Sequence, residues 1–344
     1  MIIRENVLLA PLTTLGVGGP ARYFAEPTTE AEVVDVVEFA RSQSLPLFVL
    51  GGGSNLVVAD AGFAGLVLKV GSAKVTRRDS TFTAGAGCDW DALVAQTVEG
   101  GYAGLECLSG IPGTVGGTPV QNVGAYGQEV SETIVEVRAL DLQSLEIKTL
   151  VNAECGFAYR SSLFNTTERG RYIILRVSFA LRPNGETRIG YADLQKYFSR
   201  HSGTPTLSEV RSAVREIRHS KAMLIVPGEE DARSAGSFFK NPVVAQSLFD
   251  ELSSRLLSEG LHLPSYPAGD GYRKLPAAWL VEHAGFAKGY SKGTAGISRK
   301  HALAIVNRGG ASATDIIALK DEIQAGVLDK FGIQLRTEPV LVGF

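Results

Sequence analysis

The sequence predicts a globular protein that contains both helices and strands and is divided into about two domains. The length of 344 residues suggests the domain number, since one domain typically holds about 150 residues. Hydrophobic residues make up 44% of the chain and charged residues 20%, a composition that excludes global disorder. The 39 glycines are about 11% of the residues, where ~7% is usual. This excess predicts many tight turns, or main chain that approaches another group closely.

Helical and strand-like patterns alternate in the first half of the chain. Apolar residues at helical spacing predict a helix over 28–43, capped by Thr28 or Thr29. A second helix is expected over 89–101, closed by Gly100 and Gly101. Short apolar or alternating runs predict strands at residues 21–27, 45–50, 65–70, 75–84, 134–140 and 172–181.

The character of the sequence changes after Pro183, so we expect a domain boundary between residues 183 and 219. Helices are predicted over 207–221, 275–284 and 314–331, the last with a Thr or Asp cap. The charged segment 226–234 is expected to be exposed, and residues 235–244 to form a strand or loop. The tail, residues 334–344, is expected to be a final strand.

Charge and cysteine content exclude several classes of protein. The 34 basic and 36 acidic residues leave a net charge of −2, which argues against nucleic-acid binding. The three cysteines, Cys88, Cys107 and Cys155, form no CxxC pair, so we expect buried thiols in the cytoplasm. We expect no signal peptide and no membrane span, because no uncharged apolar run reaches ~18 residues. Five scattered histidines form no HExxH pair, so no metal site is expected.

Two glycine-rich segments indicate a ligand site. GGGSN at 51–55 could cradle a phosphate with its main-chain N–H groups, although alone it is equally well explained as a turn. The second segment, residues 110–127, is long and nearly uncharged, and such a loop is expensive to order unless it wraps a ligand. Two such loops favour a ligand with two ends, such as a dinucleotide. GVGGPA at 16–21 is not the dinucleotide fingerprint, because a strand-like segment follows it, and no P-loop motif is present.

Five motifs in register resemble one known family, over residues 13–344. They are GGGSNLVV, LSGIPGTVGGTPVQNVGAYG, FAYRSSLF, AGSFFKNPVV and RTEPV, in this order. They are similar to those of UDP-N-acetylenolpyruvoylglucosamine reductases, in the subtype with a tyrosine lid loop. The resemblance implies NADPH-dependent reduction of UDP-N-acetyl-3-O-(1-carboxyvinyl)-glucosamine to UDP-N-acetylmuramate, in peptidoglycan precursor synthesis. It also implies a monomer, with non-covalent FAD as cofactor, NADPH as co-substrate and a nucleotide sugar as substrate.

The fold implied by the resemblance is α+β. A two-lobed FAD-binding domain of the vanillyl-alcohol-oxidase (PCMH) type would occupy 1–183, with lobes at about 14–70 and 71–183. A connecting segment with the lid loop would follow at 184–218. A smaller α/β substrate-binding domain would then occupy 219–330, and residues 331–344 would return as a strand to the active site.

The resemblance assigns roles to individual residues. The FAD-binding residues would be Gly51, Gly52, Gly53, Ser54, Asn55, Gly113, Thr114, Gly117, Thr118, Gln121, Asn122, Gly124, Ala125 and Tyr126. Among the catalytic residues, Ser237 would donate a proton to the substrate carbon and Arg160 would bind the substrate carboxylate. Glu338 would act near the same carboxylate, protonated or sharing a proton. Without the resemblance, these three would be interpreted as a strand serine, a surface arginine and a solvated acid.

Further residues would bind the nucleotide sugar. Tyr191, in RIGYADL, would be a lid over the diphosphate, although it could also be an ordinary packed aromatic. Lys221, Asn241, Tyr266 and Lys274 would contact the UDP part. The segment KAMLIVPGEEDARSAGSFF departs from the KLP and Gly-Asn pattern of many relatives, so Arg218 would share the role of Lys221.

Two alternatives belong to other functional classes. The first is another FAD oxidoreductase of the same fold that oxidises an alcohol or hydroxy acid. The absence of histidine before residue 201 argues against the histidyl flavin tether that such enzymes often carry. The second is a nucleotide-sugar binding protein without redox activity, which would be colourless.

Overall fold

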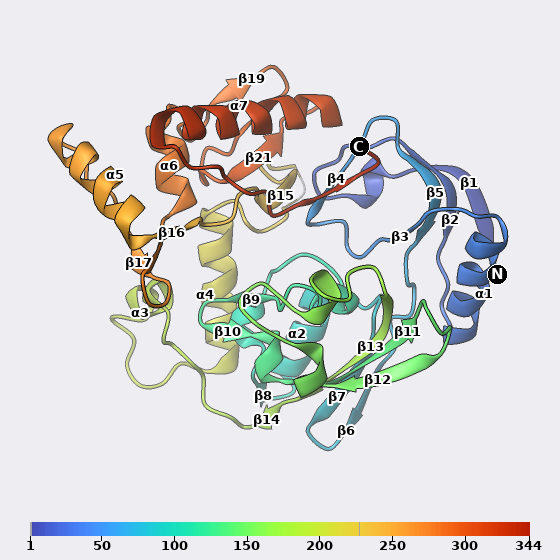
Figure 1. Cartoon of the computed structure of the whole chain (residues 1–344). Helices are drawn as coiled ribbons and strands as arrows, with labels where there is room; N and C mark the ends of the chain where they lie inside the picture. The colour runs from blue at the N-terminus through green and yellow to red at the C-terminus, as the bar shows by residue number, and fades with distance from the viewer. Residues whose placement is uncertain (1, 227) are drawn as a thin grey trace. The chain divides into compact units, whose positions relative to one another are not determined.

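The computed structural model describes residues 2–226 and 228–344, which form two compact units (Figure 1). The first unit comprises residues 2–8, 20–53 and 63–225. The second comprises residues 9–19 and 54–62 together with the described residues from 226 onward. Residues 184–225 thus belong to the first unit, and two short N-terminal segments belong to the second. One of these segments carries strand β4, Leu56–Val58, which pairs in parallel with the C-terminal strand β22, Val340–Val342.

The first sheet of the first unit has the strand order β1-β2-β5-β3. Its strands are β1, Ile3–Leu8; β2, Pro20–Ala25; β5, Phe63–Leu68; and β3, Leu47–Val49. Helix α1, Glu30–Ser42, begins as predicted: Thr29 and Glu32 form a reciprocal capping box. Its buried face, which includes Val33 and Val37, contributes to one core shared with the second sheet.

The second sheet of this unit is antiparallel, with the order β12-β11-β13-β7-β6. Its strands are β12, Ile147–Val151; β11, Ile134–Asp141; β13, Tyr172–Ala180; β7, Thr81–Gly85; and β6, Val75–Arg78. Helix α2, Trp90–Glu99, is capped by Asp89 and packs its Trp90 ring 5.8 Å from the ring of Phe179. The predicted helix near 207–221 is α4, Leu207–Ser220.

Short elements complete the first unit. The strand pairs are β8, Tyr102–Ala103, with β14, Arg182–Pro183, and β9, Gly124–Ala125, with β10, Gln128–Glu129. The 3₁₀ turns are Glu106–Leu108, Val115–Gly117, Val130–Glu132, Asn152–Cys155 and Leu163–Asn165. Helix α3, Ala192–Tyr197, forms where the sequence predicted only a lid loop.

The second unit has two further sheets. One is antiparallel, with the order β15-β21-β20-β19: β15, Ser234–Ser237; β21, Ala304–Asn307; β20, Ala295–Ile297; and β19, Ser291–Lys292. Helix α7, Ala313–Phe331, packs on β20 and β21 (Figure 1). The other sheet contains β16, Val243–Ala245; β18, Tyr272–Lys274; and β17, Tyr266–Pro267. Helices α5, Gln246–Ser258, and α6, Ala277–His283, and the 3₁₀ turn Ala10–Leu12 complete it.

Two expectations from the sequence were wrong in detail, and one helix was not predicted. Helix α7 is capped by Ser312 rather than by a Thr or Asp, because Ser312 and Asp315 form a capping box. Helix α5 was not anticipated. The segment 226–234 is not uniformly exposed: Asp231 is buried, since its carboxylate accepts hydrogen bonds from Ser298 and Arg299. Pro227, within this segment, lies outside the described residues.

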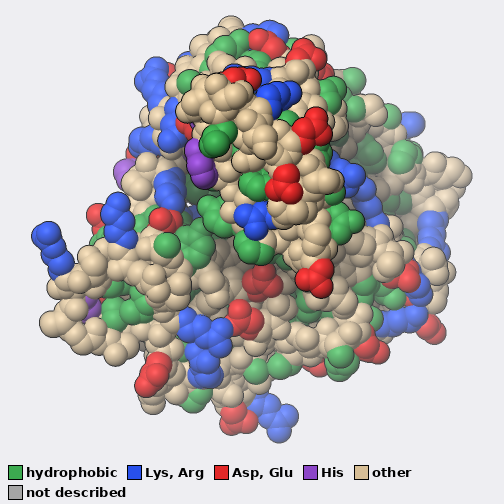
Figure 2. All heavy atoms as spheres, turned by 60° about the vertical axis from the view of Figure 1, so that its left-hand side comes forward, with side chains coloured by type: hydrophobic (Ala, Val, Ile, Leu, Met, Phe, Trp, Pro, Cys, Tyr) green, Lys and Arg blue, Asp and Glu red, His purple; other side chains and the backbone are tan. Residues whose placement is uncertain are grey.

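The cysteines are buried, as expected. Burial raises the pKa of the Cys107 thiol to about 12 and that of Cys155 to about 11, and Cys88 is also buried. Among the described residues, no helix is both long and apolar enough to cross a membrane. Acidic and basic side chains are interspersed on the face drawn in Figure 2, in keeping with the net charge of −2.

Candidate functional site

The two glycine-rich loops meet within the first unit. A Cβ added to Gly52 would lie 2.4 Å from the Cα of Gly113 and 2.8 Å from its carbonyl carbon. Both atoms are main chain and cannot turn aside, so this contact requires glycine at position 52. Gly51 lies beside Thr114, whose Oγ1 would be 3.5 Å from an added Cβ. The loops predicted to bind one ligand are therefore neighbours, although 61 residues separate Gly52 from Gly113.

Main-chain donors remain available where these loops meet. Within residues 2–226 and 228–344, the N–H groups of Gly51, Gly52, Gly113 and Thr114 donate to no protein acceptor. Gly51 and Gly52 are half-buried, and so are Gly113 and Thr114. Half-buried amides without protein partners and without obstructing side chains form the kind of concavity that binds phosphate. The residues present therefore fit the pyrophosphate of a dinucleotide.

Two polar side chains of the second loop form hydrogen bonds within the protein. The buried Thr118 hydroxyl donates to the carbonyl of Val115 at 2.8 Å. The buried Asn122 amide donates to Glu129 at 2.8 Å and to the carbonyl of Ala158 at 3.1 Å. These two side chains were expected to donate to a ligand, but the structure engages them within the protein. Their main-chain N–H groups also donate within the protein, to the carbonyls of Val115 and Pro119.

Three predicted site residues have left-handed main-chain conformations. The φ angles are +44° at Asn122, +50° at Tyr126 and +53° at Arg160. For non-glycine residues this conformation costs roughly 1–2 kcal/mol and tends to occur at functional sites. Arg160 lies in the tight turn between the paired residues Ala158 and Ser161. Because Asn122 binds Ala158, the turn that carries Arg160 is attached to the second glycine loop.

A cluster of polar groups surrounds Tyr126 in the first unit. The Tyr126 ring lies edge-on to the Tyr191 ring, with centroids 5.5 Å apart. Burial raises the pKa of the Tyr126 phenol, while the nearby Arg218 and Lys221 oppose this increase. Tyr191 precedes helix α3 and is 46% exposed. Lys221 forms an ion pair with Asp193 of α3 at 2.6 Å. The structure thus brings together three of the residues predicted to bind substrate: Tyr191, Arg218 and Lys221.

Arg218 differs from its neighbours in this cluster because it is buried. Its Nε donates to the carbonyl of Gly110 at 3.0 Å, and its Nη2 donates to the carbonyl of Met223 at 2.7 Å. Burial lowers the pKa of its guanidinium. Arg218 therefore anchors the start of the second glycine loop to the end of α4. The sequence predicted a contact with substrate for Arg218 and did not predict this anchoring role.

The second unit brings Ser237 and Glu338 close together. Ser237 ends β15, opposite Ala304 of β21. The N–H of Glu338 donates to the carbonyl of Phe238 at 3.0 Å, next to Ser237, and Phe239 pairs with Thr337. This short antiparallel pairing brings RTEPV, at 336–340, next to AGSFF, at 235–239.

The same unit holds the other predicted substrate residues. Tyr266 and Lys274 are a cross-strand pair between β17 and β18, so their side chains share one face of the small sheet. The Asn241 side-chain oxygen accepts the N–H of Ala277 at 2.9 Å and so caps helix α6. Asn241 thus has a structural role in addition to the predicted one.

His301 also contacts Ser237, although His301 was not predicted from the sequence. Its Nε2 lies 2.9 Å from the Oγ of Ser237, within hydrogen-bond distance. No spacing rule connects the two residues, which are 64 positions apart and meet only through the pairing of β15 with β21. A histidine in the turn before a buried strand was the only available indication.

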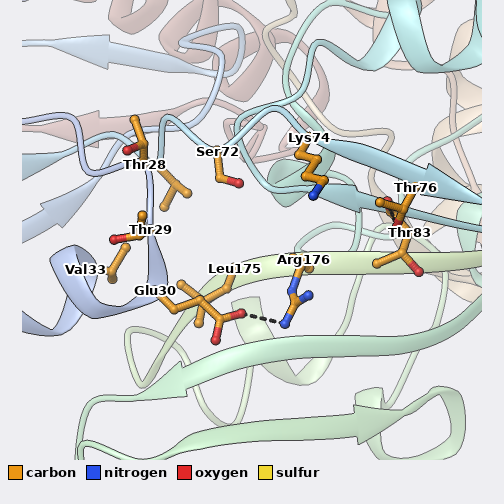
Figure 3. Close-up of a pocket in the computed structure, with 11 residues that line it drawn as sticks. Thr28, Thr29, Glu30, Val33, Ser72, Lys74, Thr76, Thr83, Leu175 and Arg176 are labelled. Atoms are coloured by element: carbon orange, nitrogen blue, oxygen red, sulfur yellow. Dashed lines mark hydrogen bonds and ion pairs between the residues drawn. The ribbon is translucent and has the colours of Figure 1, made fainter.

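A separate pocket in the first unit contains none of the predicted site residues (Figure 3). Thr28, Ser72 and Lys74 line it, and Arg176 forms an ion pair with Glu30 at 2.8 Å. This pocket is thus separate from the expected site, which is indicated by the geometry of the glycine loops.

Comparisons with known proteins agree with this geometry. Residues 21–149 match the family model described as "FAD binding domain". Residues 227–342 match "UDP-N-acetylenolpyruvoylglucosamine reductase, C-terminal domain". The fold and the glycine cradle therefore define an FAD-dependent oxidoreductase.

Full-length relatives specify the family. The UDP-N-acetylenolpyruvoylglucosamine reductase of Thermobifida fusca is 47% identical, covering 98% of this chain and 98% of that protein. The reductase of Mycobacterium ulcerans is 43% identical, covering 99% and 95%. The crystal structure of the Thermus caldophilus reductase matches with a TM-score of 0.69 and 27% identity, over 99% of this chain and 100% of that one. The chain belongs to the UDP-N-acetylenolpyruvoylglucosamine reductase family, which confirms the resemblance, the α+β fold and FAD as cofactor.

Proposed function

We propose that this chain reduces UDP-N-acetylenolpyruvoylglucosamine to UDP-N-acetylmuramate with electrons from NADPH. The observation that carries the proposal is the placement of Ser237 beside Glu338, within the region that matches the reductase C-terminal domain. The full-length likeness to reductases also favours this activity over an alcohol or hydroxy-acid oxidase. We further propose that the enzyme acts as a monomer in the cytoplasm.

The cofactor is proposed to be held mainly by main chain. The N–H groups of Gly51, Gly52, Gly113 and Thr114 would bind the FAD pyrophosphate, as half-buried amides bind anions elsewhere. The remaining loop positions expected from the family would line the cofactor: Gly53, Ser54, Asn55, Gly117, Thr118, Gln121, Asn122, Gly124, Ala125 and Tyr126. When bound, FAD supplies the hydride that adds to the terminal vinyl carbon of the substrate.

Residues of the chain are assigned two further tasks: to stabilise the negative charge that hydride addition creates, and to supply the proton that completes the reduction. Hydride addition leaves negative charge on the substrate carboxylate and the carbon beside it. The Arg160 guanidinium is proposed to bind that carboxylate, because a planar fork of donors matches its two oxygens and offsets the growing charge. Ser237 is proposed to give its hydroxyl proton to the carbon, and Glu338 to act beside Ser237 near the carboxylate.

The nucleotide part of the substrate is assigned to the two groups of residues described above. In the first unit, Tyr191 would act as the lid and Lys221 would contact the diphosphate. In the second unit, Lys274 and Tyr266 would act together from one face of their sheet. Asn241 would use the part of its amide that does not cap α6. Arg218 would act indirectly, by holding the loop at Gly110.

An anaerobic spectrum tests the proposed function. Purified protein should be yellow, NADPH should bleach the flavin, and the enolpyruvyl nucleotide sugar should restore the colour without oxygen. UDP-N-acetylglucosamine, which lacks the vinyl group, is the matched control and should leave the flavin bleached. Colour recovery with an alcohol-derived carbonyl compound, and none with the enolpyruvyl substrate, would overturn the proposal.

A further inference from the structure

The hydrogen bond between Ser237 and His301 gives the proposed proton donor a partner of its own. Oγ and Nε2 are 2.9 Å apart, the distance expected for proton exchange between a hydroxyl and an imidazole. We propose that His301 is a positioning residue that passes a proton from Nε2 to the Ser237 Oγ as Ser237 protonates the substrate. This inference rests on the proposed function, because it takes Ser237 to be the proton donor.

The chemistry of serine creates the need for such a partner. A hydroxyl is a very weak acid, and donation without a partner would leave an alkoxide. In the proposed step the Ser237 O–H bond breaks as the new C–H bond forms at the substrate. At the same time the N–H bond at Nε2 of the His301 imidazolium breaks and a new O–H bond forms at Oγ. Ser237 ends as a hydroxyl and His301 as a neutral imidazole, which takes a proton from water before the next turnover.

The main chain around His301 is fixed from a buried carboxylate. Asp231 Oδ2 accepts the Ser298 hydroxyl at 2.8 Å and the N–H of Arg299 at 2.8 Å. The Ser298 oxygen in turn accepts the N–H groups of Lys300 at 3.1 Å and His301 at 3.2 Å. The turn that carries His301 is thus tied to Asp231 by four hydrogen bonds, two of them through Ser298.

Ser237 is fixed by pairing of its strand, β15, with the neighbouring strand β21. It pairs with Ala304 of β21, and the N–H of Phe238 donates to the carbonyl of Leu303 at 2.8 Å. His301 and Leu303 are only two residues apart, so the register between β15 and β21 sets the distance from Oγ to Nε2. Because main-chain hydrogen bonds hold both residues of this pair in place, little free energy is spent on reorienting them for proton transfer.

Both acidic and basic groups lie on the segments that pack around this pair. The ionisable groups on the packed segments include Glu229, Glu230, Asp231 and Arg233 before β15, Lys240 after β15, Arg299 and Lys300 in the turn, Arg308 after β21, and Arg336 and Glu338 in the tail. Arg299 is paired with Glu230 at 2.7 Å and Lys300 with Glu229 at 3.7 Å. Asp231 forms no ion pair with any described residue, and its Oδ1 is buried without a hydrogen-bond partner among them. Asp231 is therefore the carboxylate that hydrogen bonds connect to the turn that carries His301.

His301→Gln tests the relay, because glutamine can donate a hydrogen bond to Oγ but cannot release a proton. We expect kcat to fall by roughly 100-fold, the usual contribution of a proton-transfer group. KM for the nucleotide sugar should change less than threefold, and flavin bleaching by NADPH should keep its rate. The wild-type kcat should decline as pH rises through the histidine range, near pH ~6.5, and the variant should lose this decline.

His283→Gln is the matched control. His283 lies in the same unit, where its Nδ1 is within 2.8 Å of the Trp279 carbonyl and its ring stacks on the Trp279 ring. Its replacement should leave the pH profile unchanged. His301→Ala in the presence of added imidazole should recover part of the lost kcat, which a purely structural histidine would not allow.

A measurement on the wild-type enzyme tests the relay even where a variant does not fold. Turnover in mixtures of H₂O and D₂O should depend on deuterium fraction along a curve, because two protons move together. A linear dependence, or a His301→Gln enzyme with wild-type kcat and pH profile, would overturn the relay. If Ser237→Ala is inactive in that case, the proposed function stands. If Ser237→Ala turns over normally, the donor role of Ser237 fails, and the relay fails with it.

Discussion

Replacing Gly52 by alanine tests the contact between the two glycine loops. The added Cβ would lie 2.4 Å from the Cα of Gly113, whereas ordinary contact begins at 3.4 Å. The loops would therefore have to separate by 3.4 − 2.4 = 1.0 Å. Neither partner can avoid this by rotating a side chain, because both atoms near the new methyl belong to the main chain.

A separation of this size should weaken both the fold and the cofactor site. Overpacking of this kind typically costs about 1–3 kcal/mol of folding free energy. An amide that binds a phosphate oxygen at ~2.9 Å would move to ~3.9 Å, beyond hydrogen-bond distance. A hydrogen bond to a charged group contributes about 1.5–3 kcal/mol. The loss of one or two such hydrogen bonds, already weakened, would reduce the binding free energy of FAD by about 2–4 kcal/mol. This reduction corresponds to a loss in FAD affinity of roughly 30- to 700-fold.

FAD release from the purified holoenzyme measures this effect. Flavin fluorescence rises on dissociation, so dilution series of wild type and Gly52→Ala give the two dissociation constants, and thermal unfolding gives stability. Gly190→Ala is the matched control, because its Cβ would meet no atom within 4 Å and its φ is not left-handed. It should behave as wild type in both assays. A Gly52→Ala protein whose FAD affinity stays within threefold of wild type would refute the cradle.

Three further outcomes are expected. Ser237→Ala should still be bleached by NADPH but should lose at least about 100-fold in kcat, as stopped-flow and steady-state assays would show; normal turnover would remove its role. Tyr191→Phe should weaken nucleotide-sugar binding by about 2- to 10-fold while FAD affinity is unchanged, measured by calorimetry; equal affinities would contradict the lid. Asp141→Asn should destabilise the enzyme by about 2 kcal/mol at pH 7, because buried Asp141 binds Arg171 and Lys148. The hydrogen bond from Arg171 has the largest effect on the pKa of Asp141 and lowers it. The stabilisation that ionised Asp141 provides is therefore present above pH ~3.9 and disappears as pH falls toward the lowered pKa. Denaturant unfolding at pH 7 and pH 3 checks it, and a difference that grows in acid would contradict this sign.

Local patterns were sufficient for much of the fold. The capping box at Thr29 and the period of Val33 and Val37 predict α1 from neighbouring residues alone. The cap of α7 was misplaced because Ser312, Thr314 and Asp315 are all capping residue types, and hydrogen bonding selects among them. Thr314 is nevertheless used: its N–H and hydroxyl both donate to Asp60, which lies 254 positions earlier.

The candidate site depends on contacts that no local pattern contains. The glycine content of residues 51–53 predicted a phosphate loop, but the reason for glycine at 52 lies in Gly113. The charge of Asp231 predicted exposure, since a lone carboxylate is costly to bury. The structure buries it because the turn before β21 supplies two donors that become neighbours only after the sheet has formed. His301 was missed for the same reason.

The conflicts between local preference and observed structure themselves point to function. Asn122, Tyr126 and Arg160 adopt left-handed φ angles that glycine would adopt at less cost. We propose that the polar or aromatic side chains at these three positions contribute more than the roughly 1–2 kcal/mol of strain that each incurs. For Asn122 the structure shows the contribution, since its amide joins the glycine loop to the Arg160 turn. For Tyr126 and Arg160 we propose that the corresponding gain comes from ligand binding, and we expect glycine at either position to relieve strain while lowering ligand affinity.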